Sequence, residues 1–455
     1  MRFKELRSLR FLPIQKESHF LCQWNKAPFV WNKVLFFLFF SLGVHAGEFP
    51  KRVSSILIEG NERTHSEVIL NELLFSPGDR VEQSQVSESY QRVVNTRLFS
   101  DVDFEWKNLD DQRSELRIKV QEVWTLNPII QVTGGSRLRR YTLGVVDQNF
   151  LGKFQTLGGW YDNIAGASSG ALWFKEPRFL NQFLLLHIDL RMTRRIRSLY
   201  QENNIYEGAF TSKISQFSAY LEKQIRPRFA FGGGIYLNYE QYSQDLLSEA
   251  QKDSVDSSGF TFPRNGRLFF VRGTLKFGRI DFYSYLKHGF LTELRVDQTV
   301  SLLGSEFDFT RIQLQNQSFI RFGDDMNLGF QYSLGTISRN RIQHQFFLGG
   351  LSEVRGYLDG RIRGSNFWQA NVEYRIHSFN HLWLTLQHVF FLDLANTASS
   401  FLQLFKFDQN PMSSLGLGMR FFSRKFPGFL LRIDYAWALD SRGFNGLAFG
   451  GSHFF

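Results

Sequence analysis

Residues 429–440 read Phe-Leu-Leu-Arg-Ile-Asp-Tyr-Ala-Trp-Ala-Leu-Asp and alternate between two kinds of side chain. Every odd-numbered position is apolar or aromatic, whereas the even-numbered positions include Arg432, Asp434 and Asp440. Successive side chains of a β-strand point to opposite faces, so this pattern predicts a strand with one apolar face and one polar face. Residues 326–335 alternate in the same way.

The same alternation recurs along residues 124–455, where clusters of Gly, Asn, Asp and Ser separate the segments and no long helical pattern occurs. We predict strands at 128–136, 140–150, 155–163, 170–179, 183–195, 205–225, 228–243, 267–280, 286–304, 308–323, 326–338, 367–379, 381–398, 413–422, 428–440 and 443–455. An even number of strands that are apolar on one face is typical of a transmembrane barrel, which leaves no unpaired edge in lipid. The predicted fold class is mainly β, a 16-stranded antiparallel transmembrane β-barrel.

The composition agrees with a barrel and excludes a helical membrane protein. Of the 455 residues, 43% are hydrophobic and 50 are Phe, yet the mean hydropathy is only −0.24. The longest apolar run, from Val34 to Val44, is shorter than the roughly 20 residues that a membrane-spanning helix needs. Strands that are apolar on one face only would combine many aromatic residues with a polar average.

An export signal is predicted over residues 1–46. Lys33 precedes the apolar run, and small residues follow it at a cleavage site before Gly47. The segment ahead of Lys33 is long for such a signal, which indicates that the true start codon lies downstream of Met1.

Cleavage of this predicted signal would also remove the only thiol and part of the positive charge of the chain. The single cysteine, Cys22, lies within it, so the mature chain would have no thiol for disulfides, metal binding or covalent catalysis. The signal holds seven Lys/Arg and two Asp/Glu, so the mature net charge is 46 − 41 = +5 instead of +10. A charge this small does not indicate binding to nucleic acid.

A small α+β domain is predicted over residues 50–123, with its elements in the order β-α-α-β-β. Its strands are expected at 53–59, 102–106 and 116–120. Thr64 and Glu67 have the spacing of a capping box at the start of the first helix, and Pro77-Gly78-Asp79 ends that helix.

This element order and its motifs resemble a POTRA (polypeptide-transport-associated) domain, of which the sequence contains one repeat. The residues that carry the resemblance are Gly60, Asn61, Arg63 and Thr64 after the first strand, the Pro77-Gly78-Asp79 turn, and the final Val120-Gln121-Glu122. The resemblance implies a periplasmic domain that binds an extended client segment by adding it to a sheet edge. A generic α+β module with a solvated edge is the alternative.

A second motif, Val354, Arg355, Gly356 and Tyr357, lies between the eleventh and twelfth predicted strands. It resembles the Val-Arg-Gly-Phe/Tyr motif in the sixth extracellular loop of the POTRA-plus-barrel superfamily, which includes BamA, TamA and the two-partner secretion transporters. The resemblance covers essentially the whole mature chain. It implies that the loop folds back into the lumen and that Arg355 meets acidic residues on the inner wall.

Glu373 and Asp393 are the candidate partners that the resemblance implies, since they match the superfamily's two acidic wall positions, and the alternation places both on the lumen face. A guanidinium in a narrow lumen needs a partner, and its planar set of donors can bridge two carboxylates. Gly356 would allow a tight turn where a Cβ would clash. The alternative is a solvated Arg355 and two acids that line a wet channel.

The terminal Phe455 resembles the signal by which assembly machinery recognises outer-membrane barrels. Enzymatic chemistry is not expected. Gly166-Ala167-Ser168-Ser169-Gly170 fits a Gly-x-Ser-x-Gly pattern but is typical here of a hairpin turn, and the ten histidines show no pair at zinc-ligand spacing. We expect no metal and no cofactor.

The sequence therefore predicts an outer-membrane protein with a periplasmic N-terminal domain that inserts, assembles or translocates polypeptides. The expected partners are unfolded outer-membrane or secreted client polypeptides, outer-membrane lipids and accessory periplasmic proteins or lipoproteins, and no nucleic acid. One alternative is a passive channel or surface antigen. Another is a dedicated two-partner secretion transporter, a class that usually carries two POTRA domains and a plug helix.

Overall fold

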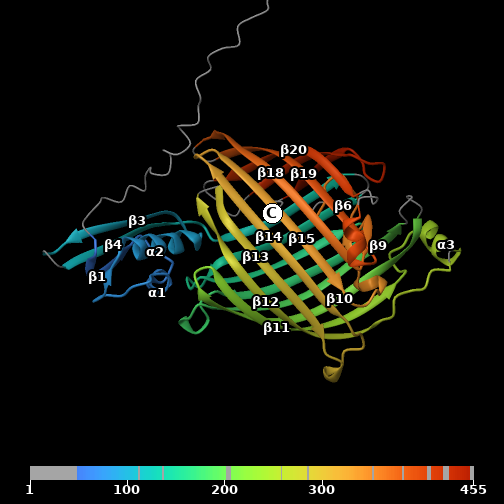
Figure 1. Cartoon of the computed structure of the whole chain (residues 1–455), viewed down its shortest axis with the longest axis horizontal. Coiled ribbons are helices and arrows are strands. Elements are labelled where there is room, and N and C mark those ends of the chain that lie inside the picture. The colour runs from blue at the N-terminus through green and yellow to red at the C-terminus, as the bar shows by residue number, and fades with distance from the viewer. Residues whose placement is uncertain are drawn as a thin grey trace, which may run out of the picture. The chain divides into compact units, whose positions relative to one another are not determined.

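The computed structural model describes residues 49–450 except for 111–112, 136–137, 201–205, 258, 284–285, 351–352, 382–383, 407–410 and 424–429. The predicted export signal and Phe455 lie outside the described residues. The described part contains a small α+β domain and a large antiparallel β-sheet (Figure 1). No helix within this part is long and apolar enough to cross a membrane.

The N-terminal domain consists of a four-stranded sheet and two helices. Its elements are β1 (Lys51–Glu59), α1 (Ser66–Leu70), β2 (Arg80–Val81), α2 (Gln83–Asn95), β3 (Phe99–Asn108) and β4 (Arg113–Glu122). The sheet order is β2-β1-β4-β3, with β1 parallel to β4 and the other pairs antiparallel. The expected β-α-α-β-β order is present, with the two-residue strand β2 as an addition after the Pro77-Gly78-Asp79 turn.

Apolar side chains at helical and strand spacing form the core of this domain. Val86 and Val93 of α2 are buried against Leu116 and Ile118 of β4 in one cluster. Burial of each such side chain stabilises the domain by roughly 1.5–3 kcal/mol. The domain therefore has a hydrophobic core of its own.

The expected capping box at α1 is wrong. The N-cap residue is His65, and no side chain caps the helix. Thr64 instead accepts a hydrogen bond on its Oγ1 from Asn149, which lies 85 residues later. The spacing of Thr64 and Glu67 is compatible with a capping box, but the tertiary contact with Asn149 holds the Thr64 side chain away from the start of the helix.

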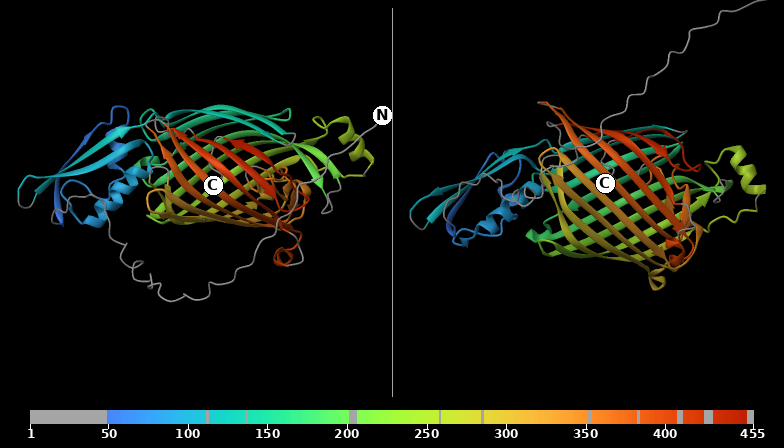
Figure 2. Two further views of the ribbon diagram at one scale, coloured as in Figure 1. Left: turned by 90° about the horizontal axis from the view of Figure 1, so that it is seen from above. Right: turned by 45° about the horizontal axis from the view of Figure 1, so that its top comes forward.

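The sixteen-stranded antiparallel sheet confirms the predicted barrel (Figures 1 and 2). Its strands are β5 (Leu126–Gly135), β6 (Leu138–Phe150), β7 (Gln155–Ile164), β8 (Ala167–Glu176), β9 (Leu184–Tyr200), β10 (Tyr206–Arg226), β11 (Phe229–Ser243), β12 (Gly266–Tyr283), β13 (Leu286–Thr299), β14 (Thr310–Phe322), β15 (Met326–Ile337), β18 (Asn366–Asn380), β19 (Leu384–Ala398), β20 (Met412–Ser423), β21 (Leu430–Ala438) and β22 (Gly446–Gly450). Each strand pairs with its neighbour along the chain, and β15 pairs with β18 across the intervening connection.

Shorter elements occupy the connections between these strands. They are α3 (Glu249–Ser257), the hairpin strands β16 (Phe346–Leu348) and β17 (Ile362–Gly364), and the 3₁₀ turns η1 (Phe179–Asn181), η2 (Ser301–Leu303), η3 (Ile342–His344) and η4 (Phe401–Phe405).

The two faces of the sheet differ as the alternation predicts. On β21, the side chain of Asp434 is completely buried in the barrel, whereas Leu431 is 40% exposed on the outer face. On β19, Asp393 is buried and Leu392 is 39% exposed. Polar side chains thus line the lumen and apolar ones cover the outer wall, as in membrane barrels.

The two ends of the barrel have different connections. The turn after β8 contacts the N-terminal domain through Arg178 and Glu72, and the end of β12 contacts it through Asp281 and Asn95. Because consecutive strands are antiparallel, the long connections after β11 and β15 lie at the opposite end. Short turns therefore face the N-terminal domain, and the long connections face away from it.

The last described strand, β22, pairs with β21 up to Gly450, where the described residues end. Its register with β21 runs from Arg432 paired with Gly450 to Ala436 paired with Gly446. Within the described ranges, the hydrogen-bonded order begins at β5 and ends at β22.

Candidate functional site

The connection from β15 to β18, residues 338–365, folds into the lumen instead of extending into solvent. It contains the hairpin of β16 and β17, and its Val354, Arg355 and Tyr357 side chains are at most 2% exposed. Val354 and Tyr357 pack in an apolar cluster with Phe367 and Met412 of the wall. The motif is therefore buried like a protein core.

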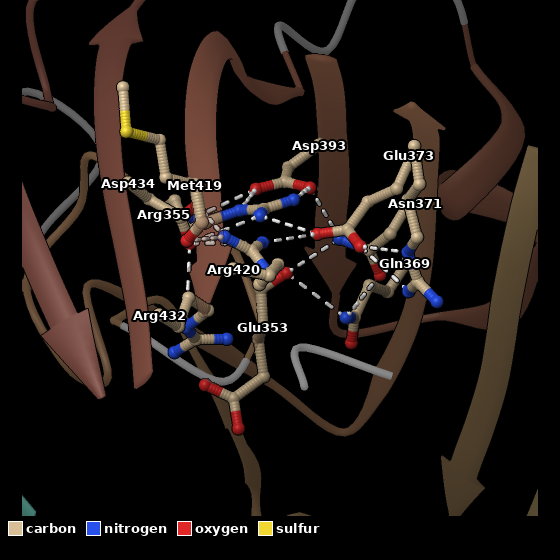
Figure 3. Close-up of polar contacts among 11 residues, drawn as sticks. Glu353, Arg355, Gln369, Asn371, Glu373, Asp393, Met419, Arg420, Arg432 and Asp434 are labelled. Carbon is tan, nitrogen blue, oxygen red and sulfur yellow. Dashed lines mark hydrogen bonds and ion pairs between the residues drawn. The ribbon is translucent and has the colours of Figure 1, made fainter. Parts of the chain in front are cut away.

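Arg355 bonds three carboxylates of the inner wall (Figure 3). Its Nε and Nη2 donate to the two oxygens of Asp393 at 2.7 and 2.8 Å, and its Nη1 donates to Glu373 Oε1 at 2.7 Å. A longer contact of 3.4 Å joins Nη1 to Asp434 Oδ2. The guanidinium also lies 3.4 Å from the centre of the Phe391 ring, which adds a cation–π contact. We call Arg355 with Glu373, Asp393 and Asp434 the arginine lock.

The lock keeps Arg355 charged. Burial alone would lower the pKa of Arg355, but Asp393, Glu373 and Asp434 outweigh burial and raise that pKa above its ordinary value. The bidentate pair with Asp393 is the strong, geometrically specific form of an arginine–carboxylate bond.

Arginines of the wall share the same carboxylates. Arg375 lies 2.7 Å from Glu373, and Arg420 bridges Asp434 at 2.6 Å and Glu373 at 3.1 Å. Arg432 lies 3.4 Å from Asp434. The three wall arginines therefore contact Glu373 and Asp434, whereas Asp393 pairs with Arg355 of the loop, which adds a fourth positive charge.

Backbone geometry places the arginine. Gly356 has a φ of +85°, in the left-handed region where L side chains are strained, and a Cβ there would lie 3.2 Å from the Phe444 carbonyl oxygen. Tyr357 follows and donates its hydroxyl to Ser413 O and Asp440 Oδ2, both at 2.8 Å. The loop thus turns sharply between an arginine bonded to β18, β19 and β21 and a tyrosine bonded near β20.

Amide side chains of β18 hold the residue before this turn. Gln369 and Asn371 both donate to the backbone oxygen of Glu353, at 3.0 and 2.9 Å. Asn371 also donates to Asp393 Oδ1 at 3.0 Å. These bonds orient the loop backbone and one lock carboxylate together.

The other part of the loop is bonded to the opposite wall. His344 Nε2 lies 2.9 Å from Glu240 Oε2 on β11, and Glu240 also accepts from the Tyr242 hydroxyl at 2.8 Å. Arg363 donates to Glu207 on β10 at 2.5 Å. We call these contacts the second anchor. The loop therefore crosses the lumen between two anchors that lie half the sheet apart in strand order.

The POTRA motif residues lie together at one end of the N-terminal domain. Gly60 has a φ of +90° and leaves no space for a Cβ beside the Val120 carbonyl. Asn61 Nδ2 donates to Thr64 O at 2.9 Å, and the Glu122 carboxylate accepts from the backbone N–H of Arg63 at 3.0 Å and of Thr64 at 2.6 Å. The first and last motifs of the domain thus form one bonded unit.

The same motif contacts the barrel. Arg63 donates to Asp147 Oδ2 on β6 at 2.6 Å and to Thr125 Oγ1 at 3.0 Å. Asn149 donates to Thr64 Oγ1 at 2.9 Å. The side chains of Arg63 and Thr64 therefore form a joint between the domain and the first barrel hairpin.

The sequence paired Arg355 with Glu373 and Asp393, and the structure brings these three residues together. Sequence reasoning missed Asp434, Arg420 and the second anchor. Asp434 stood on the polar face of the alternating stretch 429–440, but alternation does not show which lumen residues of distant strands meet.

Three features together define a class of outer-membrane β-barrel protein. They are a sixteen-stranded barrel with an apolar outer wall, a loop that the arginine lock holds inside the lumen, and a POTRA-like domain. The chain belongs to the Omp85 superfamily, whose domain model matches residues 149–455. A POTRA model described as surface antigen variable number repeat matches residues 51–123. The barrel lies in the outer membrane, and the POTRA domain lies in the periplasm.

Known proteins are similar to this chain in sequence. The outer membrane protein assembly factor BamA of Nitratidesulfovibrio vulgaris is 24% identical over 419 residues, which cover 85% of this chain and 48% of that protein. The chain spans about half the length of the curated relatives it matches.

Solved structures share the fold. BamA from Haemophilus ducreyi lacking POTRA domains 1–3 has a TM-score of 0.54 and 16% identity, covering 89% of this chain and 84% of that one. CdiB from Escherichia coli has a TM-score of 0.64 and 12% identity, covering 88% and 76%. At these identities the likeness concerns the fold alone.

Proposed function

We propose that this protein inserts, assembles or translocates polypeptides at the bacterial outer membrane. In this proposal, residues 1–46 are an export signal, residues 50–123 a periplasmic client-binding domain and residues 124–455 the barrel. The clients are unfolded outer-membrane or secreted polypeptides. Accessory periplasmic proteins or lipoproteins, as well as outer-membrane lipids, are further proposed partners.

The arginine lock is the observation that carries this proposal. A buried ion pair contributes little net stability, because desolvation of the charges offsets their attraction. Such pairs are better suited to holding one defined arrangement, and here they hold a loop inside the lumen. A loop bonded across the lumen narrows the passage of a pore, whereas a machine that guides a chain can use a loop with one fixed position.

Two strand edges support a route for the client. Among the described residues, β3 (Phe99–Asn108) pairs only with β4, so its other edge offers backbone donors and acceptors to an extended segment. At the barrel, β22 contains Gly446 and Gly450, which weaken strand packing. A client strand captured at β3 would then pass to the β5–β22 edge or through the lumen.

The proposed mechanism needs no covalent step, metal or cofactor. Backbone hydrogen bonds capture the client, and the free energy comes from folding of the client into the membrane. We therefore propose that the protein is not an enzyme.

The proposal is tested by the rate at which an unfolded outer-membrane protein folds into liposomes with and without this purified protein. We expect an acceleration of about tenfold, which corresponds to ~1.4 kcal/mol of barrier height. The acceleration should fall in Arg355→Ala and in a variant lacking residues 50–122. Arg339→Ala is the matched control, because the Arg339 side chain is 65% exposed outside the lock.

Other outcomes favour the alternatives. No acceleration, together with a steady ion conductance that the truncation leaves unchanged, would favour a passive channel. Transport of one secreted partner without any effect on barrel folding would favour a dedicated secretion transporter.

A further inference from the structure

The outer wall of the barrel carries a depression that the proposed function does not use. It has a volume of about 1500 Å³ and extends over β5 to β12, from Asp147 near the N-terminal domain to Arg267 at the opposite end. Its lining side chains point outward, since Leu172 and Leu190 are 63% and 52% exposed. We call this depression the outer-wall groove.

A missing side chain contributes to the hollow at this place. Gly159 on β7 pairs with Leu172 on β8 and Gly170 on β8 pairs with Tyr161 on β7, so both glycines occupy outward positions. The Leu172 side chain lies over Gly159, whereas no side chain of the described residues lies within 4 Å of a Cβ placed at Gly170. The floor of the groove is therefore lowest at Gly170.

The lining chemistry identifies what fills the groove. Besides the glycines, outward leucines and aromatic residues dominate it, including Leu143, Tyr161 and Phe217. A contiguous apolar surface of this size is not normally left in water. The groove is continuous with the outer wall of a membrane barrel, which contacts lipid hydrocarbon. Acyl chains are therefore the chemistry that fits it.

The far end of the groove is basic. Arg267 lines this end, and the side chains of Arg264 and Arg267 are 65% and 75% exposed. Both arginines share one carboxylate, that of Glu306, at 3.4 Å. This end therefore keeps a net positive charge, beside the exposed Leu302 and Leu303 of η2. Exposed guanidinium groups next to an apolar surface suit a phosphate-bearing headgroup.

We propose that the outer-wall groove binds an anionic acyl-chain lipid, with its chains over Gly170 and its phosphate at Arg264 and Arg267. The inference rests on the barrel lying in the outer membrane and does not require client insertion. The lipid is recognised by two features together, an apolar floor and a basic end.

Native mass spectrometry of the full chain tests this proposal. The protein is folded into vesicles of phosphatidylcholine alone, or with added phosphatidylglycerol or lipid A, and is then extracted into mild detergent. We expect anionic lipid to remain bound in preference to phosphatidylcholine. The double variant Arg264→Gln/Arg267→Gln should lower retention about tenfold, and Leu190→Trp, which fills the groove, should lower it as well.

Matched variants on other surfaces serve as controls. Arg339→Gln removes an equally exposed arginine, and Leu417→Trp enlarges an outward side chain on β20 that is 46% exposed. Both should retain lipid like the wild type, and heat-modifiable migration on gels shows that each variant folds. A higher retention of lipid A or of phosphatidylglycerol identifies the headgroup source.

Equal retention of neutral and anionic lipid would overturn the proposal, as would equal loss in the control variants. A second copy of the chain retained in place of lipid would also overturn it. Because the readout is bound lipid, its failure is distinguishable from failure of the client-folding experiment.

Discussion

At the scale of single residues, the ion pairs of the inner wall show what Arg355 contributes to the arginine lock. Arg375 and Arg420 lie against Glu373, and Arg420 and Arg432 lie against Asp434. Without Arg355, these two carboxylates would keep arginine partners, whereas Asp393 would lose its bidentate bond and keep the hydrogen bond from Asn371. The bidentate bond to Asp393 therefore gives the lock its geometric specificity.

Replacement of Arg355 by Ala should destabilise the folded barrel by about 3–5 kcal/mol, because it removes one partner from a desolvated set of charges. The wall arginines should keep the loss at the lower end of this range. Arg355→Lys should restore little, since an ammonium does not form the bidentate bond. The urea midpoint of unfolding measures the effect, and a loss no larger than that of Arg339→Ala would contradict it.

The contribution of Asp440 to the stability of the protein should depend on pH. Burial raises the pKa of Asp440, but hydrogen bonds from Arg442 and Tyr357 outweigh burial and leave that pKa below its ordinary value. A lowered carboxyl pKa contributes stability above the unfolded value of about 3.9, and this contribution is lost as the pH falls through the folded value.

Asp440→Asn should therefore be less stable than the wild type by about 1 kcal/mol at neutral pH. The difference should shrink toward zero on acidification to about pH 3. Urea midpoints of the two proteins across this pH range provide the measurement. A difference that stays constant with pH would show that the charge of Asp440 is not involved.

At the scale of elements, helix α2 connects the POTRA domain to the barrel turns. Glu88 forms an ion pair with Arg279 of β12, and Asn95 donates to Asp281 at 2.8 Å. Arg92 lies one turn after Glu88 on the same face of the helix, over the Phe183 ring and 4.2 Å from its centre. One face of α2 packs in the domain core, and its remaining polar side chains contact the barrel.

Glu88→Gln should weaken the contact between α2 and β12 by about 1 kcal/mol, because the pair of residue 88 with Arg279 loses one of its charges. Arg279 keeps Asp281 as a partner, which limits the loss. Pulsed electron paramagnetic resonance between spin labels on α2 and on the turn after β12 should show a broader distance distribution. Glu105→Gln is the control, since the Glu105–Lys119 pair lies within the domain. Equal broadening in both variants would contradict an interdomain role for Glu88.

At the scale of the whole molecule, the loop from β15 to β18 acts as a strap across the lumen. The arginine lock holds one part of it on β18, β19 and β21, and the second anchor holds another part on β10 and β11. Release of one anchor alone would leave the strap attached to the other wall. We therefore expect that the two anchors together hold the loop across the passage through the barrel.

The double variant Arg355→Ala/Glu240→Gln should raise ion conductance in planar bilayers several-fold over the wild type. Each single variant should raise it less, because one anchor still holds the loop across the lumen. Conductance that is already high in the wild type, and unchanged in the double variant, would show that the strap does not obstruct the passage.

Much of the fold could be read from the sequence, because alternation along a strand is a local property of the pleated backbone. It placed fifteen of the sixteen strands within five residues of their observed bounds, and the predicted end of the last strand lies outside the described residues. It also put Glu373, Asp393 and Asp434 on the lumen face. The resemblance of Val354 to Tyr357 to a known loop motif then directed attention to Glu373 and Asp393. The failed capping box at Thr64 shows the limit, since a distant partner, Asn149, outweighed the local pattern.

The sequence by itself therefore determined the strands and their two faces, and the resemblance of its loop motif to a known family pointed to the pairing of Arg355 with Glu373 and Asp393. Only the tertiary structure decided that Asp434 joins the lock, that the loop reaches Glu240 on the opposite wall, and that outward residues of neighbouring strands form one groove. The physical reason is that which side a residue faces depends on its own strand alone. Which residues of distant strands meet depends on the register of every ladder between them and on closure of the sheet.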